Sequence, residues 1–288
     1  MTAGSTPLRD RLRDAARAGR PLLLGPDLAT QRAEGATPIA GALRHAAHEL
    51  VATARAIVDA GAELVLAPTT HTTAPALHRT GQAYRAAALT ATAVDLTRDA
   101  VFAARKGAAV LGEIDADAGG KARQESRTHV ERLVTSAIDG VLLHARDLEA
   151  TLDLLRTSAE HGVPALIELA PADARRFAAA LGALSTSPAV VVLVVRSADV
   201  GLLRDALAPL RAQAEASEGR LNLGARLVTA EDPVQAQLEA AAAWQELAAL
   251  GTCVLGVDGP ASLAALRALA ELVRGDRLSL PTATLRDR

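Results

Sequence analysis

Polar side chains with catalytic or ligand-binding chemistry follow a series of short apolar segments in this sequence. Carboxylates and imidazoles in such places can act as general acids, general bases or metal ligands. Arginines suit carboxylate or phosphate groups, because a planar guanidinium binds them through two parallel hydrogen bonds. The candidate site residues are Asp27, Thr69, Thr70, His71, Glu113, Asp115, His144, Glu168, Arg196, Ser197, Arg226 and Asp258.

The chemistry of these side chains divides them into catalytic and binding candidates. His71, His144 and Glu113 are the candidates for catalysis, with either histidine serving as a general base or as the group that activates a thiol. Arg196 and Arg226 are the candidates for gripping a negatively charged substrate. The remaining residues of the set are expected to bind the substrate.

A structural role is the alternative for the aspartates of the set. Asp27, Asp115 and Asp258 each stand where helix-capping residues stand, between an apolar segment and the amphipathic segment after it. Asp147 and Asp199 stand in the same kind of place. Both interpretations stay open for each aspartate, whereas the recurrence of polar residues after many segments favours one shared site.

The apolar segments are continuous runs separated by amphipathic stretches with helical periodicity. Strands buried on both faces have this appearance, because the helices of βαβ units cover both sides of a parallel sheet. Eight such units in a chain of 288 residues predict a single (β/α)8 TIM barrel, whose strand ends meet at one mouth. The runs occupy residues 21–25, 62–68, 107–113, 139–144, 163–169, 189–197, 219–228 and 251–258.

The segments between the runs complete the predicted domain organisation. Residues 1–20 are predicted to be an N-terminal helical extension that closes the bottom of the barrel, and residues 21–288 to form the barrel itself. The stretch 74–106 is too long for one barrel helix and predicts two helices or a bent one. Residues 29–45 and 113–126 are predicted to be long loops at the mouth.

Composition argues against several classes of partner. The 31 basic and 33 acidic residues nearly cancel, and two Phe, one Tyr and one Trp are too few for stacking nucleic-acid bases. A single cysteine excludes an internal disulfide and suits a reducing compartment. No run is long enough to span a membrane, and no secretory signal is recognisable. We expect a cytoplasmic protein with a small-molecule substrate, as a homo-oligomer or in complex with a pathway protein.

Segments along most of the chain carry a resemblance to a known family, and three of them illustrate it. LLLGPDLATQRAEG (22–35) has an opening strand and a glycine turn, and VDAGAELVLAPTTHTT (58–73) has a strand that ends in threonines. WQELAALGTCVLGVDGPASLAALRAL (244–269) has the last strand between two helices. They resemble the homocysteine S-methyltransferase family, over residues 20–272. The resemblance implies a TIM barrel that takes a methyl group from betaine, S-methylmethionine or a methylated folate.

The resemblance also implies a zinc ion, held by three cysteines, that activates the thiol of homocysteine. Ser197 stands near the first of these cysteines, and Asp258 and Gly259 stand near the adjacent pair. Cys253 falls inside the last expected strand, where we expect a small buried apolar residue. Because none of the three positions carries a thiol, we expect no zinc and name no other cofactor.

Three functions agree with these observations, and we prefer an enzyme. The first is a divergent methyltransferase-like enzyme that acts on a small carboxylate-bearing or thiol substrate. The second is a catalytically silent barrel that binds an assembly partner, because all three thiolates are missing. The third is an Mg²⁺- or Mn²⁺-dependent lyase or hydrolase, since the mouth offers oxygen and nitrogen ligands. Those ligands are His71, Glu113, Asp115, His144, Glu168 and Asp258.

Overall fold

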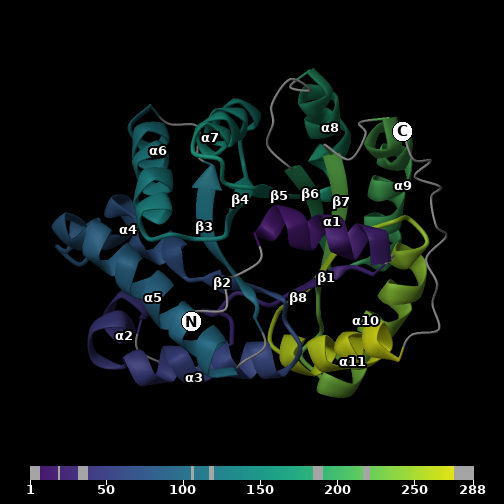
Figure 1. Cartoon of the computed structure of the whole chain (residues 1–288), viewed down its shortest axis with the longest axis horizontal. Helices are drawn as coiled ribbons and strands as arrows, with labels where there is room; N and C mark the ends of the chain where they lie inside the picture. Colours follow the sequence, from purple (N-terminus) through teal and green to yellow (C-terminus); the bar gives the residue numbers. More distant parts are fainter. Residues whose placement is uncertain are drawn as a thin grey trace.

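The computed structural model describes residues 7–18, 20–31, 38–104, 107–116, 120–183, 191–216 and 221–275. Eight parallel strands close into a barrel in the order of the sequence, with helices around it (Figure 1). The (β/α)8 fold predicted from the sequence is confirmed. The strands are β1 (Leu22–Leu24), β2 (Leu64–Ala67), β3 (Ala109–Ala116), β4 (Gly140–Ala145), β5 (Ala165–Leu169), β6 (Val191–Ser197), β7 (Leu221–Val228) and β8 (Val254–Asp258).

The helices follow the strands in the expected alternation. The 74–106 stretch contains two α-helices, as predicted. The α-helices are α1 (Leu8–Ala18), α2 (Ile39–His45), α3 (Ala47–Asp59), α4 (Ala74–His78), α5 (Ala86–Ala104), α6 (Gly120–Thr135), α7 (Leu148–Glu160), α8 (Ala174–Ala183), α9 (Val200–Ala216), α10 (Pro233–Ala248) and α11 (Ser262–Arg274). Short 3₁₀ turns are η1 (Thr69–Thr72), η2 (Ala83–Arg85) and η3 (Pro171–Asp173).

The two long loops predicted at the mouth are shorter than expected. Helix α2 begins at Ile39, inside the stretch 29–45, and residues 32–37 lie outside the described residues. Strand β3 continues through Ala116 and α6 begins at Gly120, so most of the stretch 113–126 is regular structure. Residues 117–119 lie outside the described residues. The prediction was wrong because polar residues at the end of β3 were read as a loop, although they continue the strand.

Alternate side chains of each strand enter two separate apolar cores. In β2, Leu64 and Leu66 belong to the core inside the barrel, whereas Val65 and Ala67 belong to the core between barrel and helices. The strand period of two residues produces this division, and both sets are buried because helices cover the outside. Every second residue of a strand therefore points its side chain into the barrel interior.

Helix α1 closes the bottom of the barrel, at the amino ends of the strands. Leu8, Leu12 and Ala15 are buried in the inner core, together with the first residues of several strands. A side-chain Cβ at Gly140, the first residue of β4, would lie 2.6 Å from Leu8 Cδ2, so glycine makes room for the helix. Helix α1 lies where a closing helix was predicted.

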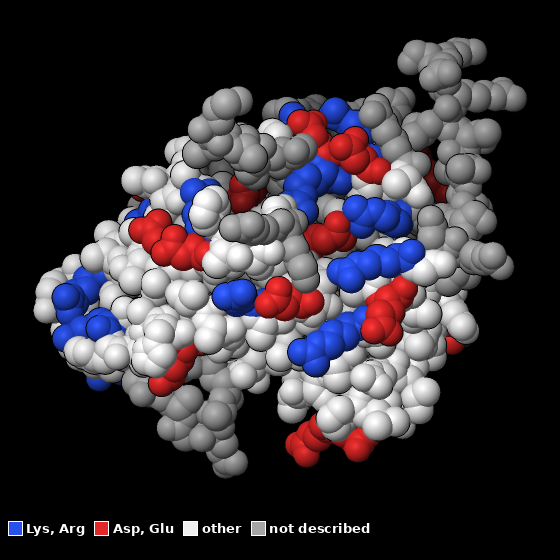
Figure 2. Space-filling view, turned by 60° about the horizontal axis from the view of Figure 1, so that its bottom comes forward, with Lys and Arg blue, Asp and Glu red and all other residues white. Residues whose placement is uncertain are grey.

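Charges on the described surface are mixed rather than segregated. Figure 2 shows positive and negative side chains interspersed over one face of the molecule, without a broad area of either sign. This pattern agrees with the near cancellation of charge in the sequence. Within the described ranges, no helix combines the length and the apolar character needed to cross a membrane.

Candidate functional site

A cavity of about 880 Å³ opens at the carboxyl ends of the barrel strands. Ligand sites of TIM barrels lie at this end, because the loops that follow the strands converge there. The structure brings most of the predicted site residues to the cavity lining, and it leaves out Thr69 and Ser197. The predicted residues that line it are Asp27, Thr70, His71, Glu113, Asp115, His144, Glu168, Arg196, Arg226 and Asp258.

The charged floor of the cavity continues the inward-facing rows of the strands. In β3, Leu111 belongs to the inner core, and Glu113 follows it two residues later. In β5, Leu166 belongs to the inner core and Glu168 follows in the same way. The register of β4 and β5 places His144 directly beside Glu168. Apolar layers therefore fill the lower barrel, and a layer of charged side chains lies on top of them.

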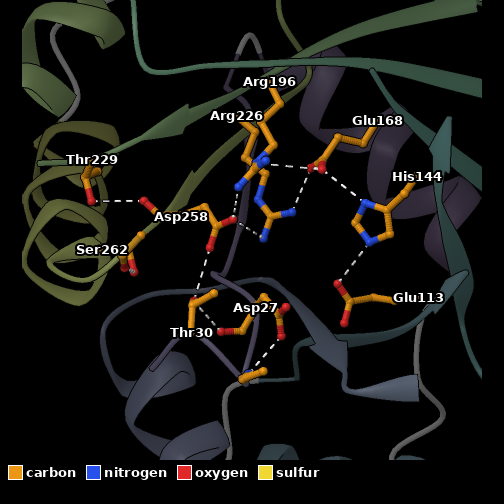
Figure 3. A network of polar contacts seen from close by, with 12 residues as sticks. Asp27, Thr30, Glu113, His144, Glu168, Arg196, Arg226, Thr229, Asp258 and Ser262 are labelled. Atoms are coloured by element: carbon orange, nitrogen blue, oxygen red, sulfur yellow. Dashed lines mark hydrogen bonds and ion pairs between the residues drawn. The ribbon is translucent and has the colours of Figure 1, made fainter. Parts of the chain in front are cut away.

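His144 lies between two carboxylates at the centre of this layer (Figure 3). Its Nδ1 is 3.1 Å from Oε1 of Glu168, and its Nε2 is 3.4 Å from Oε1 of Glu113. Burial by itself would lower the pKa of His144, but the contacts with the two carboxylates outweigh it and raise the pKa to about 10. The ring is therefore an imidazolium at neutral pH, with both nitrogens facing carboxylates.

Glu113 is the carboxyl group of the floor with the weakest set of partners. Only 1% of the residue is exposed, and neither oxygen has a hydrogen bond of normal geometry. Burial raises the pKa of Glu113 to about 7, the negative charge of Asp27 adds to the increase, and His144 opposes it. A carboxyl group with this pKa can both accept and release a proton near neutral pH.

Glu168 and Arg226 form a buried ion pair beside the histidine. Nη1 of Arg226 donates to Oε2 of Glu168 at 2.7 Å, and Arg226 is 1% exposed. Burial would raise the pKa of Glu168, but Arg226 and then His144 lower it to about 2. A Cβ at Gly256, opposite Arg226 in β8, would lie 3.2 Å from Arg226 Cγ, so this glycine leaves space for the arginine stem.

Asp258 joins the second arginine to the same network. Nη2 of Arg196 donates to Oδ2 of Asp258 at 2.8 Å, and Nη2 of Arg226 is 3.7 Å from the same oxygen. The hydroxyl of Thr30 donates to the other carboxylate oxygen at 3.2 Å. Burial would raise the pKa of Asp258, but Arg226 and Arg196 hold it below its usual value. Arg196 is the more accessible arginine, with 42% of its side chain exposed.

Thr69 supports the site from outside the cavity. Its hydroxyl oxygen accepts the backbone N–H of Glu113 at 2.8 Å and donates to the Glu113 carbonyl at 2.9 Å. Thr69 is fully buried, so these bonds are shielded from water. The residue fixes the backbone that carries the Glu113 carboxyl group and does not itself line the cavity.

The remaining predicted residues occupy distinct places. Ser197 is not part of the lining, and its hydroxyl accepts the backbone N–H of Asp199. Asp115 lies at the rim and pairs with Arg146 at 3.1 Å. The Asp27 carboxylate accepts the backbone N–H of Ala29. His71 lines the cavity on an exposed part of η1.

The capping interpretation holds for some aspartates and not for others. Asp147 caps α7 by accepting the N–H of Ala150, and Asp199 accepts the N–H of Leu202 in the first turn of α9. Asp258 instead contacts arginine side chains in the floor of the cavity.

Thr30 and Arg79 are among the lining residues that were not predicted from the sequence. Thr30 lies in the segment after β1. The sequence predicted a functional loop there but did not single out Thr30. Arg79 directly follows α4 and lies well beyond the end of β2, whereas the candidate residues were sought at the strand ends. An exposed arginine in a helical stretch carries no signal that distinguishes it from other surface arginines.

The residues at the ligand positions of a three-cysteine zinc site do not supply such a site. The Ser197 hydroxyl accepts the backbone N–H of Asp199, two arginines contact the Asp258 carboxylate, and Gly259 has no side chain. Cys253 precedes β8 in the inner core at the opposite end of the barrel from the mouth. Over the described ranges, no group of three or more His, Cys, Asp or Glu is placed to hold a metal ion.

No protein-family model matches this sequence, and no curated protein matches it. Solved structures do match. The metallated form of the homocysteine methyltransferase MmuM from Escherichia coli has a TM-score of 0.75 and 18% sequence identity, over 93% of this chain and 100% of that chain. Its oxidized form also has a TM-score of 0.75 and 18% identity, over 92% of this chain and 98% of that chain.

Tryptophan synthase from M. tuberculosis, in its aminoacrylate- and BRD0059-bound form, is a more distant match. Its TM-score is 0.54 at 18% identity, over 96% of this chain and 100% of that chain. At such identities these likenesses show that the chain has a TIM-barrel fold, and a shared fold alone does not assign a reaction.

Proposed function

We propose that this protein is an enzyme that binds a small, carboxylate-bearing thiol in the barrel mouth and transfers a methyl group to its sulfur. The observation that carries the proposal is Glu113. It is a buried carboxyl group with a pKa of about 7 that lines the cavity beside a cationic imidazole. A general base works best when its pKa is close to the working pH.

The proton of the thiol is the one that Glu113 takes. An ordinary thiol has a pKa of about 8.5, so transfer to a carboxylate with a pKa of about 7 costs roughly 2 kcal/mol. The cationic ring of His144 offsets part of this cost, because it attracts the thiolate that forms. An electron pair of the sulfur then bonds to the methyl carbon, and the donor leaves with the electrons of the bond that breaks.

The role of general base therefore belongs to Glu113 rather than to His144. Both ring nitrogens of His144 face carboxylates and the ring is already charged, so it has no free site for a further proton. Arg196 holds the substrate carboxylate, because it is exposed to the cavity and its fork has donors beyond the one that Asp258 uses. Arg226 positions Glu168 and through it His144.

The choice of a methyl group rests on resemblance. The sequence resembles the homocysteine S-methyltransferase family, and the barrel is similar in fold to a homocysteine methyltransferase. The proposal contains no zinc step, since Ser197, Asp258 and Gly259 provide no thiolate at the positions where that family has its ligands. Proton removal by Glu113 replaces the activation that a metal would provide.

The test is an assay of homocysteine consumption with betaine, S-methylmethionine and a methylated folate as donors. Wild-type protein should turn over with at least one donor, and kcat/KM should rise with pH through about 7, as Glu113 becomes ionised. Glu113→Gln should lower kcat/KM by about 10²–10⁴. Arg267→Gln, an exposed position on α11 outside the cavity lining, should keep the wild-type rate.

A catalytically silent binding barrel is the second candidate, and one observation favours it. The charged side chains of the floor, Glu168, Arg226, Asp258 and Arg196, are already paired with one another, as expected for a structural layer. This candidate predicts no turnover with any donor and a stable complex with a partner from native lysate.

A further inference from the structure

One wall of the cavity differs in charge from its floor. The wall consists of residues 69–79, which follow β2 and contain η1 and α4. It contains no carboxylate, whereas acidic and basic side chains alternate across the floor. The wall contributes Thr70, His71, Thr73, Pro75, Ala76 and Arg79 to the cavity lining.

Three polar side chains of this wall have no partner within the described part of the chain. They are the hydroxyl of Thr70, the imidazole of His71 and the guanidinium of Arg79, and all three line the cavity. Arginines of the floor, by contrast, are bound to Glu168 and Asp258. Unused donors that converge on a cavity from one wall can be satisfied by an acceptor of a ligand.

The wall is held firmly by its neighbours. Glu125 of α6 accepts the backbone N–H of Ala74 at 3.0 Å, and the Thr73 hydroxyl accepts the N–H of Ala76. The hydroxyl of Thr72 lies 2.8 Å from that of Thr90 in α5, and both residues are fully buried. The backbone that carries Arg79 is therefore preorganised, which lowers the entropy lost on binding.

The geometry points to an anion subsite on this wall, in which Arg79, His71 and Thr70 bind a carboxylate or phosphate group at the rim of the mouth. Arg79 supplies the charge and a planar pair of donors, and the other two side chains supply further hydrogen bonds. This inference rests on the proposed function, because the ligand of the subsite occupies the same barrel mouth as the proposed substrate. It adds a second anionic group to the one that Arg196 holds.

The two anion-binding arginines lie on opposite sides of the mouth. The wall follows β2 and Arg196 lies at the end of β6, four strands away in a closed ring of eight. Two sources can supply the second anionic group, namely the far end of one dianionic substrate or a separate anionic co-substrate. The chemistry recognised on the wall is the same in both cases, and binding stoichiometry distinguishes them.

Isothermal titration calorimetry with butyrate and with glutarate tests the subsite without any need for turnover. The titrations use wild-type protein, Arg79→Gln, Arg196→Gln and the matched surface control Arg267→Gln. Arg79→Gln should weaken glutarate binding about tenfold or abolish one of two binding events, because a charge-assisted hydrogen bond is lost. Arg267→Gln should match the wild type in affinity and stoichiometry.

Each result has a defined meaning. One glutarate per chain, weakened by both Arg79→Gln and Arg196→Gln, assigns the two anionic groups to one ligand. Two carboxylates per chain, each lost with a different arginine, assigns the rim group to a co-substrate. Equal binding by wild type and Arg79→Gln, or no saturable binding of either probe, overturns the subsite. Failure of the proposed function is separate, since it appears as absent turnover while these carboxylates still bind.

Discussion

Glu113 changes its charge near neutral pH because its carboxyl group has been removed from water. Its native pKa of about 7 lies above the ordinary value of 4.5, so the folded chain binds more protons than the unfolded chain between these pH values. Stability therefore falls as pH rises through this window. His144 has the same sign, because its native pKa of about 10 exceeds 6.5 and its contribution is lost as pH rises through that interval.

Replacing Glu113 with glutamine should remove the contribution of Glu113 to this pH dependence. The free energy of unfolding of Glu113→Gln, relative to wild type, should rise between pH 5 and pH 8 by up to about 3 kcal/mol. Urea denaturation at pH 5, 6.5 and 8 measures it. Glu246→Gln, an exposed position on α10, is the control and should show no such trend. A difference that stays constant or falls with pH would mean that Glu113 is ionised in the fold throughout this range.

The positions of the strand ends explain how much of the candidate site could be predicted from the sequence. Each strand end carries its polar residue immediately after an apolar run, and a closed parallel barrel necessarily gathers such ends at one mouth. Glu113, His144 and Glu168 were found in this way, and they lie in one network. Which of them would touch required the register between neighbouring strands, and a single sequence does not contain that register.

Strand β6 shows why Ser197 was chosen in addition to Arg196. Its residues before Arg196 are apolar on both faces, because the strand is buried on both sides. Because polar and apolar residues do not alternate in this strand, its sequence does not show which side chains point into the barrel and which point outward. Val192 and Val194 belong to the inner core, so Arg196 continues the inward row and Ser197 does not.

Helix α1 should contribute to stability as a part of the barrel core. Leu8 is 1% exposed and contacts the bottom layer where Gly140 leaves room for it. Leu8→Ala should lower the free energy of unfolding by about 2–5 kcal/mol in urea denaturation. Arg13→Ala, which breaks an exposed ion pair with Asp10 on the same helix, should cost about 1 kcal/mol or less. Equal small effects would show that α1 is detached from the core.

The two ends of the barrel differ in the kind of side chains that fill them. Apolar side chains and α1 fill the lower barrel, and the charged network with the cavity occupies the upper end. Changes at the bottom should therefore alter stability, and changes at the mouth should alter binding or turnover. Cys253 offers a reporter of the lower end, because it is the single cysteine of the chain.

The reactivity of Cys253 should measure the opening of the whole barrel. Burial leaves 5% of the residue exposed and raises the pKa of its thiol to about 12, so the folded chain presents almost no thiolate to a reagent such as Ellman's disulfide. Labelling should proceed through unfolding, and Leu8→Ala should accelerate it about thirtyfold or more, in proportion to its loss of stability. Arg79→Gln at the mouth should label at the wild-type rate. Labelling of the wild type within minutes in the absence of urea would instead mean that the bottom of the barrel opens locally, independently of the mouth.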